Sequence, residues 1–65
     1  MKYKLFDVIV LNEDILEHNL KAGMVGAIVD IYSEPEDAYE VEFCDKDGQT
    51  ICMLPLYHYQ ILALE

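Results

Sequence analysis

The segment Tyr39–Phe43 alternates strictly between apolar and acidic side chains, and this pattern constrains the fold more than any other. Its tyrosine, valine and phenylalanine fall on one side of an extended backbone, and Glu40 and Glu42 fall on the other. Asp47-Gly48 follows, and an Asp-Gly dipeptide favours a tight hairpin turn. We therefore predict a strand, a hairpin and a returning antiparallel strand over Gln49–Leu54.

Three further segments have the composition of β-strands. Leu5–Leu11 is β-branched and apolar with a single charge, and Ala27–Tyr32 alternates around Asp30. Ile61–Leu64 is a short apolar run near the other end. Pro55 is expected to end the strand that follows the hairpin, because proline has no N–H to donate to a strand ladder. The sequence therefore predicts five short strands.

The longest connection is Asn12–Met24, which is too polar and irregular for a strand. Asp14 and Glu17 have the spacing of a capping box, so we expect a short helical turn beside them. Gly23 and Gly26 are expected to bracket a turn that leads into the second strand.

Two other connections complete the pattern. Ser33–Asp37 is a solvated loop around a proline, and Leu56–Gln60 is long enough for one 3-10 turn. Five short strands, with a long first loop and a 3-10 turn before the last strand, follow the order of an SH3-like barrel. We predict an all-β fold, a small five-stranded SH3-like barrel, formed by residues 1–65 as one domain. Closure of the barrel is expected to hide the sheet edges.

The charge of the chain restricts its partners. Thirteen acidic residues stand against four lysines and no arginine, which leaves a net charge of −9. Proteins that bind nucleic acid neutralise phosphates with lysine and arginine. We therefore expect the protein to bind neither nucleic acid nor an anionic membrane. The acidity either keeps a small β-protein soluble or steers a basic partner toward it.

The expected location is the cytoplasm. After Met1-Lys2-Tyr3-Lys4, only two apolar residues, Leu5 and Phe6, come before Asp7, and we therefore expect no apolar core of a secretory signal. No run approaches the ~20 apolar residues of a membrane-spanning helix. In that compartment Cys44 and Cys52 stay reduced, and we expect them to behave as small hydrophobic residues in strands.

The chain has no recognisable catalytic or metal motif. Asp45-Lys46-Asp47-Gly48 has its glycine in the fourth position, whereas a calcium loop needs glycine sixth and glutamate twelfth. Zinc sites bring ligands in close pairs, and the two cysteines, like His18 and His58, have no near partner. A reactive cysteine needs a base in an electropositive setting, which an acidic chain opposes. We predict no enzyme, no cofactor and no metal.

The segment before the last strand is the most informative for function. Tyr57 and Tyr59 fall where SH3-like barrels place a helical turn beside their ligand groove, and tyrosine is typical of recognition surfaces. The acidic loop residues Glu13, Asp14 and Glu17 are expected to form the facing wall. Alternatively, the tyrosines cap the end of the barrel and the acids form a solvated face.

Several segments also carry a likeness to known sequences: Leu5-Phe6-Asp7-Val8, Glu13-Asp14-Ile15, Leu20-Lys21-Ala22-Gly23, Val25-Gly26, Val29, Tyr39-Glu40-Val41-Glu42-Phe43, Asp47-Gly48 and Leu54–Ile61. In these residues the chain resembles a family of short bacterial proteins, the domain of unknown function family 4926. The resemblance implies an SH3-like barrel and a bacterial source, and it implies no activity. Met24 departs from the family, in which a polar residue often precedes the Val-Gly pair.

We therefore expect a non-catalytic protein–protein interaction module with a basic protein partner. One alternative is an antitoxin or inhibitor, whose acidic surface covers a basic surface of its target. The resemblance points the same way, because genes of this family look like small partners of neighbouring genes. Another alternative is a subunit of an enzyme complex. Self-association through an exposed edge or apolar patch is compatible with each of these.

Overall fold

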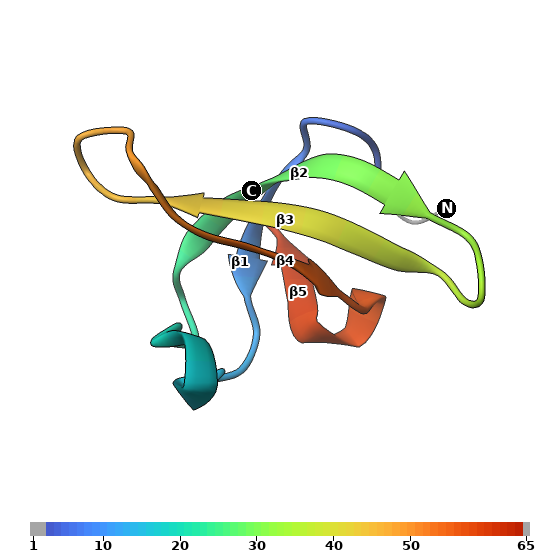
Figure 1. Ribbon diagram of the computed structural model, residues 1–65, viewed down its shortest axis with the longest axis horizontal. Coiled ribbons are helices and arrows are strands. Elements are labelled where there is room, and N and C mark those ends of the chain that lie inside the picture. The colour runs from blue at the N-terminus through green and yellow to red at the C-terminus, as the bar shows by residue number, and fades with distance from the viewer. Residues whose placement is uncertain (1–2, 65) are drawn as a thin grey trace.

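The computed structural model describes residues 3–64, which form one five-stranded antiparallel sheet with two 3-10 turns (Figure 1). The spatial order of the strands is β4-β3-β2-β1-β5. In Figure 1, β2 and β3 run across the picture while β1 and β5 run steeply to them, so the sheet bends around its buried face. The elements are β1 Val8–Leu11, η1 Leu16–His18, β2 Val25–Tyr32, β3 Ala38–Cys44, β4 Thr50–Leu56, η2 His58–Gln60 and β5 Ile61–Ala63.

The core lies on the concave side of the sheet and draws on every strand. One row of paired residues crosses the sheet from Ile9 through Gly26 and Phe43 to Cys52. The predicted alternation in β3 is confirmed, because its apolar residues are buried while its glutamates are half-exposed. The buried side chains are Tyr3, Ile9, Leu11, Leu20, Ile28, Tyr39, Val41, Phe43, Leu56 and Ile61.

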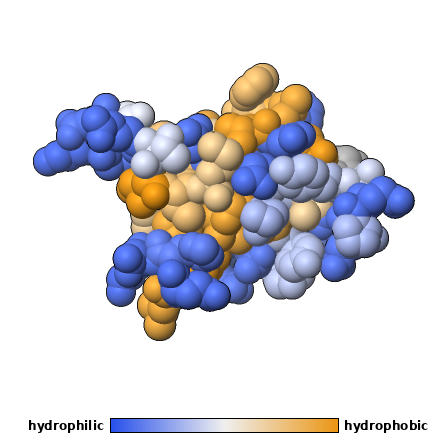
Figure 2. All heavy atoms as spheres, viewed as in Figure 1, coloured by the Kyte–Doolittle hydropathy of each residue, from blue (hydrophilic) through white to orange (hydrophobic). Residues whose placement is uncertain are grey.

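The hairpin between β3 and β4 forms at the predicted dipeptide. The backbone N–H of Gly48 donates to the carbonyl oxygen of Asp45 at 3.0 Å. The Asp45 carboxylate accepts two further backbone N–H groups, from Asp47 at 2.9 Å and from Gln49 at 3.0 Å. Gly48 has a φ of +84°, a left-handed conformation that other residues adopt at a cost. In Figure 2 this hairpin is a hydrophilic end of the molecule, whereas hydrophobic residues reach the surface in the middle of the view.

The conformation of Gly48 leads to a first prediction. Gly48→Val should lower the free energy of unfolding by about 1–3 kcal/mol, because a β-branched residue is strained at this φ. The measurement is urea denaturation followed by circular dichroism. Gly48→Asn is the matched control, since asparagine tolerates the left-handed region, and it should lose much less stability. Equal losses in the two variants would show that backbone strain is not the cause.

Pro55 lies inside β4, so the prediction that it ends the strand was wrong. It pairs with Glu40 of β3. Because β4 is an edge strand, the missing N–H can fall on the side that has no neighbouring strand, and no ladder hydrogen bond is lost.

Two predictions about the long loop were also wrong. Gly26 does not bracket a turn but lies within β2 on the buried face. Asp14 and Glu17 do not form a capping box, since the N-cap of η1 is Ile15 and no side chain caps it. The Asp14 carboxylate instead accepts the backbone N–H of Ala22 at 2.8 Å. The fold of the loop brings the Ala22 N–H close to Asp14, so the Asp14 carboxylate binds this donor and does not cap η1.

The first strand is shorter than predicted and begins at Val8. Phe6 has a φ of +70° and interrupts the extended backbone. The turn around it is closed by the Asp7 carboxylate, which accepts the backbone N–H of Lys4 at 2.9 Å. The backbone N–H of Asp7 donates in return to the carbonyl oxygen of Lys4 at 3.1 Å.

The expected closure of the sheet is not observed, and β4 and β5 are both edges. Tyr3 lies between β3 and β5 instead. Its ring meets that of Tyr39 edge-on at 5.4 Å, and its hydroxyl donates to the carbonyl oxygen of Ile61 at 3.3 Å. A buried side chain from outside the strands therefore connects β5 to β3, whereas closure of a barrel requires direct pairing of the two edge strands.

Candidate functional site

Tyr57 and Tyr59 lie side by side at the turn η2, just before β5. Their rings are stacked, with centroids 5.6 Å apart and planes 19° from parallel. Tyr57 is half-buried, whereas Tyr59 is 60% exposed. Gln60 fixes the turn, because its side-chain oxygen accepts the backbone N–H of Tyr57 at 2.8 Å. The turn therefore holds two aromatic side chains in one fixed arrangement, one of them open to solvent.

The long loop contacts this turn directly. The backbone N–H of Asn12 donates to the carbonyl oxygen of Gln60 at 2.7 Å. The Asn12 side-chain amide donates to the carbonyl oxygen of Tyr59 at 3.2 Å. The Gln60 amide donates to the Glu13 carboxylate at 3.2 Å. Glu13 is therefore placed beside the tyrosine turn.

The other two acids of the predicted wall are placed differently. Asp14 is exposed, but its carboxylate is engaged by the backbone of Ala22 within the loop. Glu17 lies exposed on η1, and the contacts above do not join it to the tyrosines. Of the three loop acids, Glu13 is the one that the structure brings to η2.

An acid that sequence reasoning missed also lies beside the pair. The Glu36 carboxylate raises the pKa of Tyr57 above its ordinary value of 10.0, chiefly because its negative charge disfavours the phenolate. Glu36 comes from the loop between β2 and β3, more than twenty positions before Tyr57 in the chain. No sequence pattern links the two residues, since only the pairing of β3 with β4 brings that loop back to the tyrosines.

The arrangement is suited to binding. Two stacked aromatic rings offer an apolar surface with polar tips, and the Glu13 and Glu36 carboxylates add negative charge near them. A lysine or arginine that approaches such a surface meets both aromatic faces and carboxylates. His58 lies edge-on to Tyr59, with ring centroids 5.7 Å apart.

Comparison with known protein families identifies the family of the chain. It matches the family described as Domain of unknown function (DUF4926) over residues 5–63, which is most of its length. The chain belongs to the DUF4926 family. The resemblance seen in the sequence is thereby confirmed. Searches of curated proteins and of solved structures each return no match.

Met24 has a structural role in the long loop. Met24 is half-buried and packs against the core. Its sulfur also accepts the backbone N–H of Lys21 at 3.2 Å. The apolar side chain in the long loop is therefore used to attach that loop to the sheet.

The remaining candidates from the sequence are dispersed. Cys52 packs against the core as expected, whereas Cys44 is exposed and does not behave as a buried hydrophobic residue. Within residues 3–64, no group of three or more histidine, cysteine, aspartate or glutamate side chains gathers where it could hold a metal ion. In the same part of the chain, no helix has the length and apolar character to cross a membrane.

Proposed function

We propose that this DUF4926 protein is a non-catalytic interaction module that docks a basic protein segment on its tyrosine face. We define the tyrosine face as Tyr57, Tyr59, Glu13 and Glu36. The observation that carries the proposal is the stacked tyrosine pair with Tyr59 60% exposed. Exposed, rigid aromatic residues are the usual anchors of protein interfaces.

The fold and the charge both support this proposal. The order β4-β3-β2-β1-β5, with a 3-10 turn before β5, favours an SH3-like barrel left open on one side. In SH3-like domains, the aromatic side chains that bind ligands lie beside this turn. A net charge of −9 favours a basic partner and opposes contact with nucleic acid or an anionic membrane.

An antitoxin or inhibitor is the more specific form of the same proposal. The net charge of −9 on a chain of 65 residues favours it, because an acidic domain can cover a basic catalytic or nucleic-acid-binding surface. The first partner to test is the product of the neighbouring gene, and the criterion is whether binding abolishes an activity of that product.

The tyrosine face leads to a second prediction. Tyr57→Ala should weaken binding of the basic partner by about 2 kcal/mol, chiefly through faster dissociation, because anchor residues carry most of the interface energy. Glu13→Gln with Glu17→Gln should slow association and flatten its dependence on ionic strength, leaving dissociation nearly unchanged. Surface plasmon resonance at several salt concentrations measures both effects.

Two controls separate binding from folding. Each variant must first give a wild-type circular dichroism spectrum and melting curve. Tyr32→Ala is the matched aromatic control, because the Tyr32 hydroxyl donates to Glu40 at 3.1 Å on the outer side of the sheet. It should bind as wild type. A folded Tyr57→Ala protein that binds with unchanged affinity would contradict the tyrosine face as the docking site.

A further inference from the structure

A second surface, on the convex side of the sheet, is apolar where solvent-facing strands are usually polar. One row of paired residues on this side runs from Val8 through Ala27 and Glu42 to Met53, and a second pairs Leu62 with Val10 and Val10 with Val25. We call these residues, together with Cys44, the outer face. The exposed fractions are 46% for Val8, 49% for Val25 and Met53, and 51% for Leu62.

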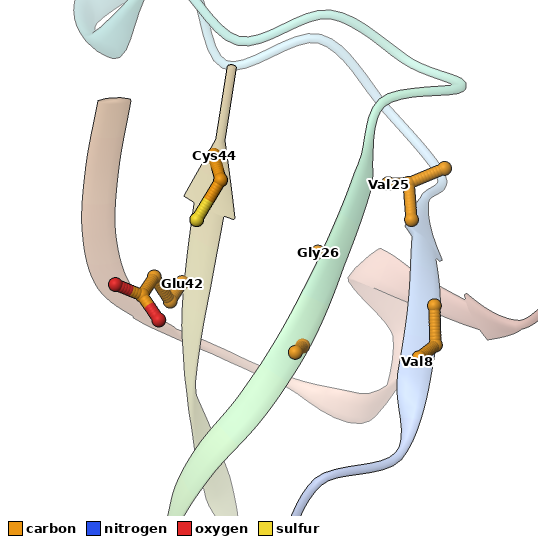
Figure 3. A pocket seen from close by; sticks show the side chains of 6 residues that line it. Val8, Val25, Gly26, Glu42 and Cys44 are labelled. Atoms are coloured by element: carbon orange, nitrogen blue, oxygen red, sulfur yellow. The ribbon is translucent and has the colours of Figure 1, made fainter. Parts of the chain in front are cut away.

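The outer face is hollowed at its centre. A depression of about 300 Å³ is lined by residues of β1, β2 and β3, namely Val8, Val25, Gly26, Ala27, Glu42 and Cys44. Figure 3 shows Val8 and Val25 on one side of β2 and Glu42 and Cys44 on the other. The hollow exists because β2 carries a glycine and an alanine at this point, so no large side chain rises from the middle strand.

The apolar outer face differs from the solvent-facing side of an ordinary single antiparallel sheet. When one face packs the core and the other meets water, strands alternate between apolar and polar residues. β3 follows that rule, but the residues of β1 are Val-Ile-Val-Leu, apolar on both faces. Contiguous exposed apolar patches mark interaction sites. A single sheet with two apolar faces lacks the second layer that normally covers it.

Strand addition at the edges is not the natural way to cover the outer face. β5 has only three residues, and Pro55 removes one N–H donor from β4. Short edge strands and prolines are features that oppose edge pairing. A helix lying across the strands is the usual cover for a sheet face.

The charges on the outer face determine which helix fits. The charged side chain that lines the hollow is Glu42, and Glu40 lies next to it on β3. The lysines of the described chain, Lys4, Lys21 and Lys46, all lie in loops. A second copy would bring another net charge of −9 and more β3 glutamates to the contact, which opposes self-association.

We propose that the outer face docks an amphipathic helix of another protein, whose apolar side enters the hollow and whose flanking lysines or arginines meet Glu40 and Glu42. This surface is separate from the tyrosine face, and the proposal does not depend on it. A helix of about 14 residues is about 21 Å long at 1.5 Å per residue, which matches the molecule's shorter dimensions of 22 Å and 20 Å.

The test uses three synthetic peptides of about 14 residues. The first contains leucine and lysine arranged so that all leucines share one helical face. The second has the same composition in scrambled order, and the third replaces every lysine of the first with glutamate. Isothermal titration should show binding of the first peptide, at least about tenfold weaker binding of the scrambled peptide, and none of the glutamate peptide. The scrambled peptide measures nonspecific attraction between an acidic protein and a basic peptide.

Two variants locate the binding. Val8→Thr with Val25→Thr keeps the β-branched shape but replaces one methyl group of each side chain with a hydroxyl group, and it should weaken binding of the leucine–lysine peptide about tenfold. Glu42→Gln should weaken binding of the same peptide at low salt and make its affinity less dependent on ionic strength. Leu16→Ala, on η1 and outside both proposed faces, is the matched control for removing an exposed apolar side chain, and it should leave this peptide's affinity unchanged.

Backbone amide chemical-shift mapping on the wild-type protein keeps the proposal testable even if a variant does not fold. Shifts concentrated at Val8, Val25, Ala27, Glu42 and Cys44 on adding the leucine–lysine peptide support it. Three results overturn it: equal binding of ordered and scrambled peptides, shifts confined to the tyrosine face, or a wild-type dimer in analytical ultracentrifugation that Val8→Thr with Val25→Thr dissociates. The last result would assign the outer face to a second copy of the chain.

Discussion

Replacing Gly26 by valine is expected to lower the free energy of unfolding by about 3 kcal/mol or more, which is enough to unfold much of a domain of this size. A Cβ atom built at Gly26 would lie 2.8 Å from Cγ1 of Val41 and 2.9 Å from two ring carbons of Phe43. Both neighbours are fully buried, so neither can move aside without displacing the rest of the core. Urea denaturation followed by tyrosine fluorescence measures the loss.

Three further variants test this cause. Ala27→Val adds the same kind of bulk one residue later, toward the open hollow of the outer face, and should change stability by less than about 0.5 kcal/mol. Gly26→Ala should destabilise the protein less than valine does. The double variant Gly26→Ala with Phe43→Leu makes room for the new methyl group. Its loss of unfolding free energy should be smaller than the sum of the losses in the two single variants. Strict additivity would show that the Phe43 ring is not what excludes a side chain at Gly26.

Truncating Leu20 to alanine is expected to lower the free energy of unfolding by about 2–5 kcal/mol. Leu20 lies in the long loop, yet its side chain is completely buried in the core. It forms an isolated bridge with Ile15, in which the two residues exchange backbone hydrogen bonds of 2.8 Å and 3.1 Å. Losing this side chain leaves a cavity and releases the loop that holds Glu13 beside η2.

Leu16→Ala is the matched control for this prediction, because Leu16 lies in the same loop with its side chain 69% exposed. It should change stability by less than about 0.5 kcal/mol. Hydrogen exchange of the loop amides provides a second measurement, since exchange should accelerate in Leu20→Ala and not in Leu16→Ala. Similar losses in the two variants would show that Leu20 does not anchor the loop.

Features that depend on residues close together in the sequence were predicted correctly. The alternation in β3 places Tyr39, Val41 and Phe43 in the core, because successive side chains of a strand point to opposite faces. The Asp47-Gly48 turn also forms, since its geometry depends on the glycine itself. The 3-10 turn before the last strand likewise falls within the predicted segment.

The predictions that failed depend on neighbours distant in the chain. Whether a glycine marks a turn or makes room in a core is decided by what packs against it, and at Gly26 these neighbours are Val41 and Phe43 on the next strand. Whether a proline ends a strand depends on whether a second strand lies beyond it, and β4 has none beyond it. A turn glycine and a core glycine can have the same hydrophobic residues around them in the sequence. The same is true of a proline that ends a strand and a proline inside an edge strand.

The same division applies to the candidate site. The sequence by itself pointed to Tyr57 and Tyr59 through composition and position, and it determined the acidic charge of the protein. Only the tertiary structure decided that Glu13 and Glu36 stand near the tyrosines while Asp14 is held within its loop. The tertiary structure also decided which residues form the outer face, because exposed and buried valines look the same in a sequence. Strand register assigns each of them to the core or to the surface.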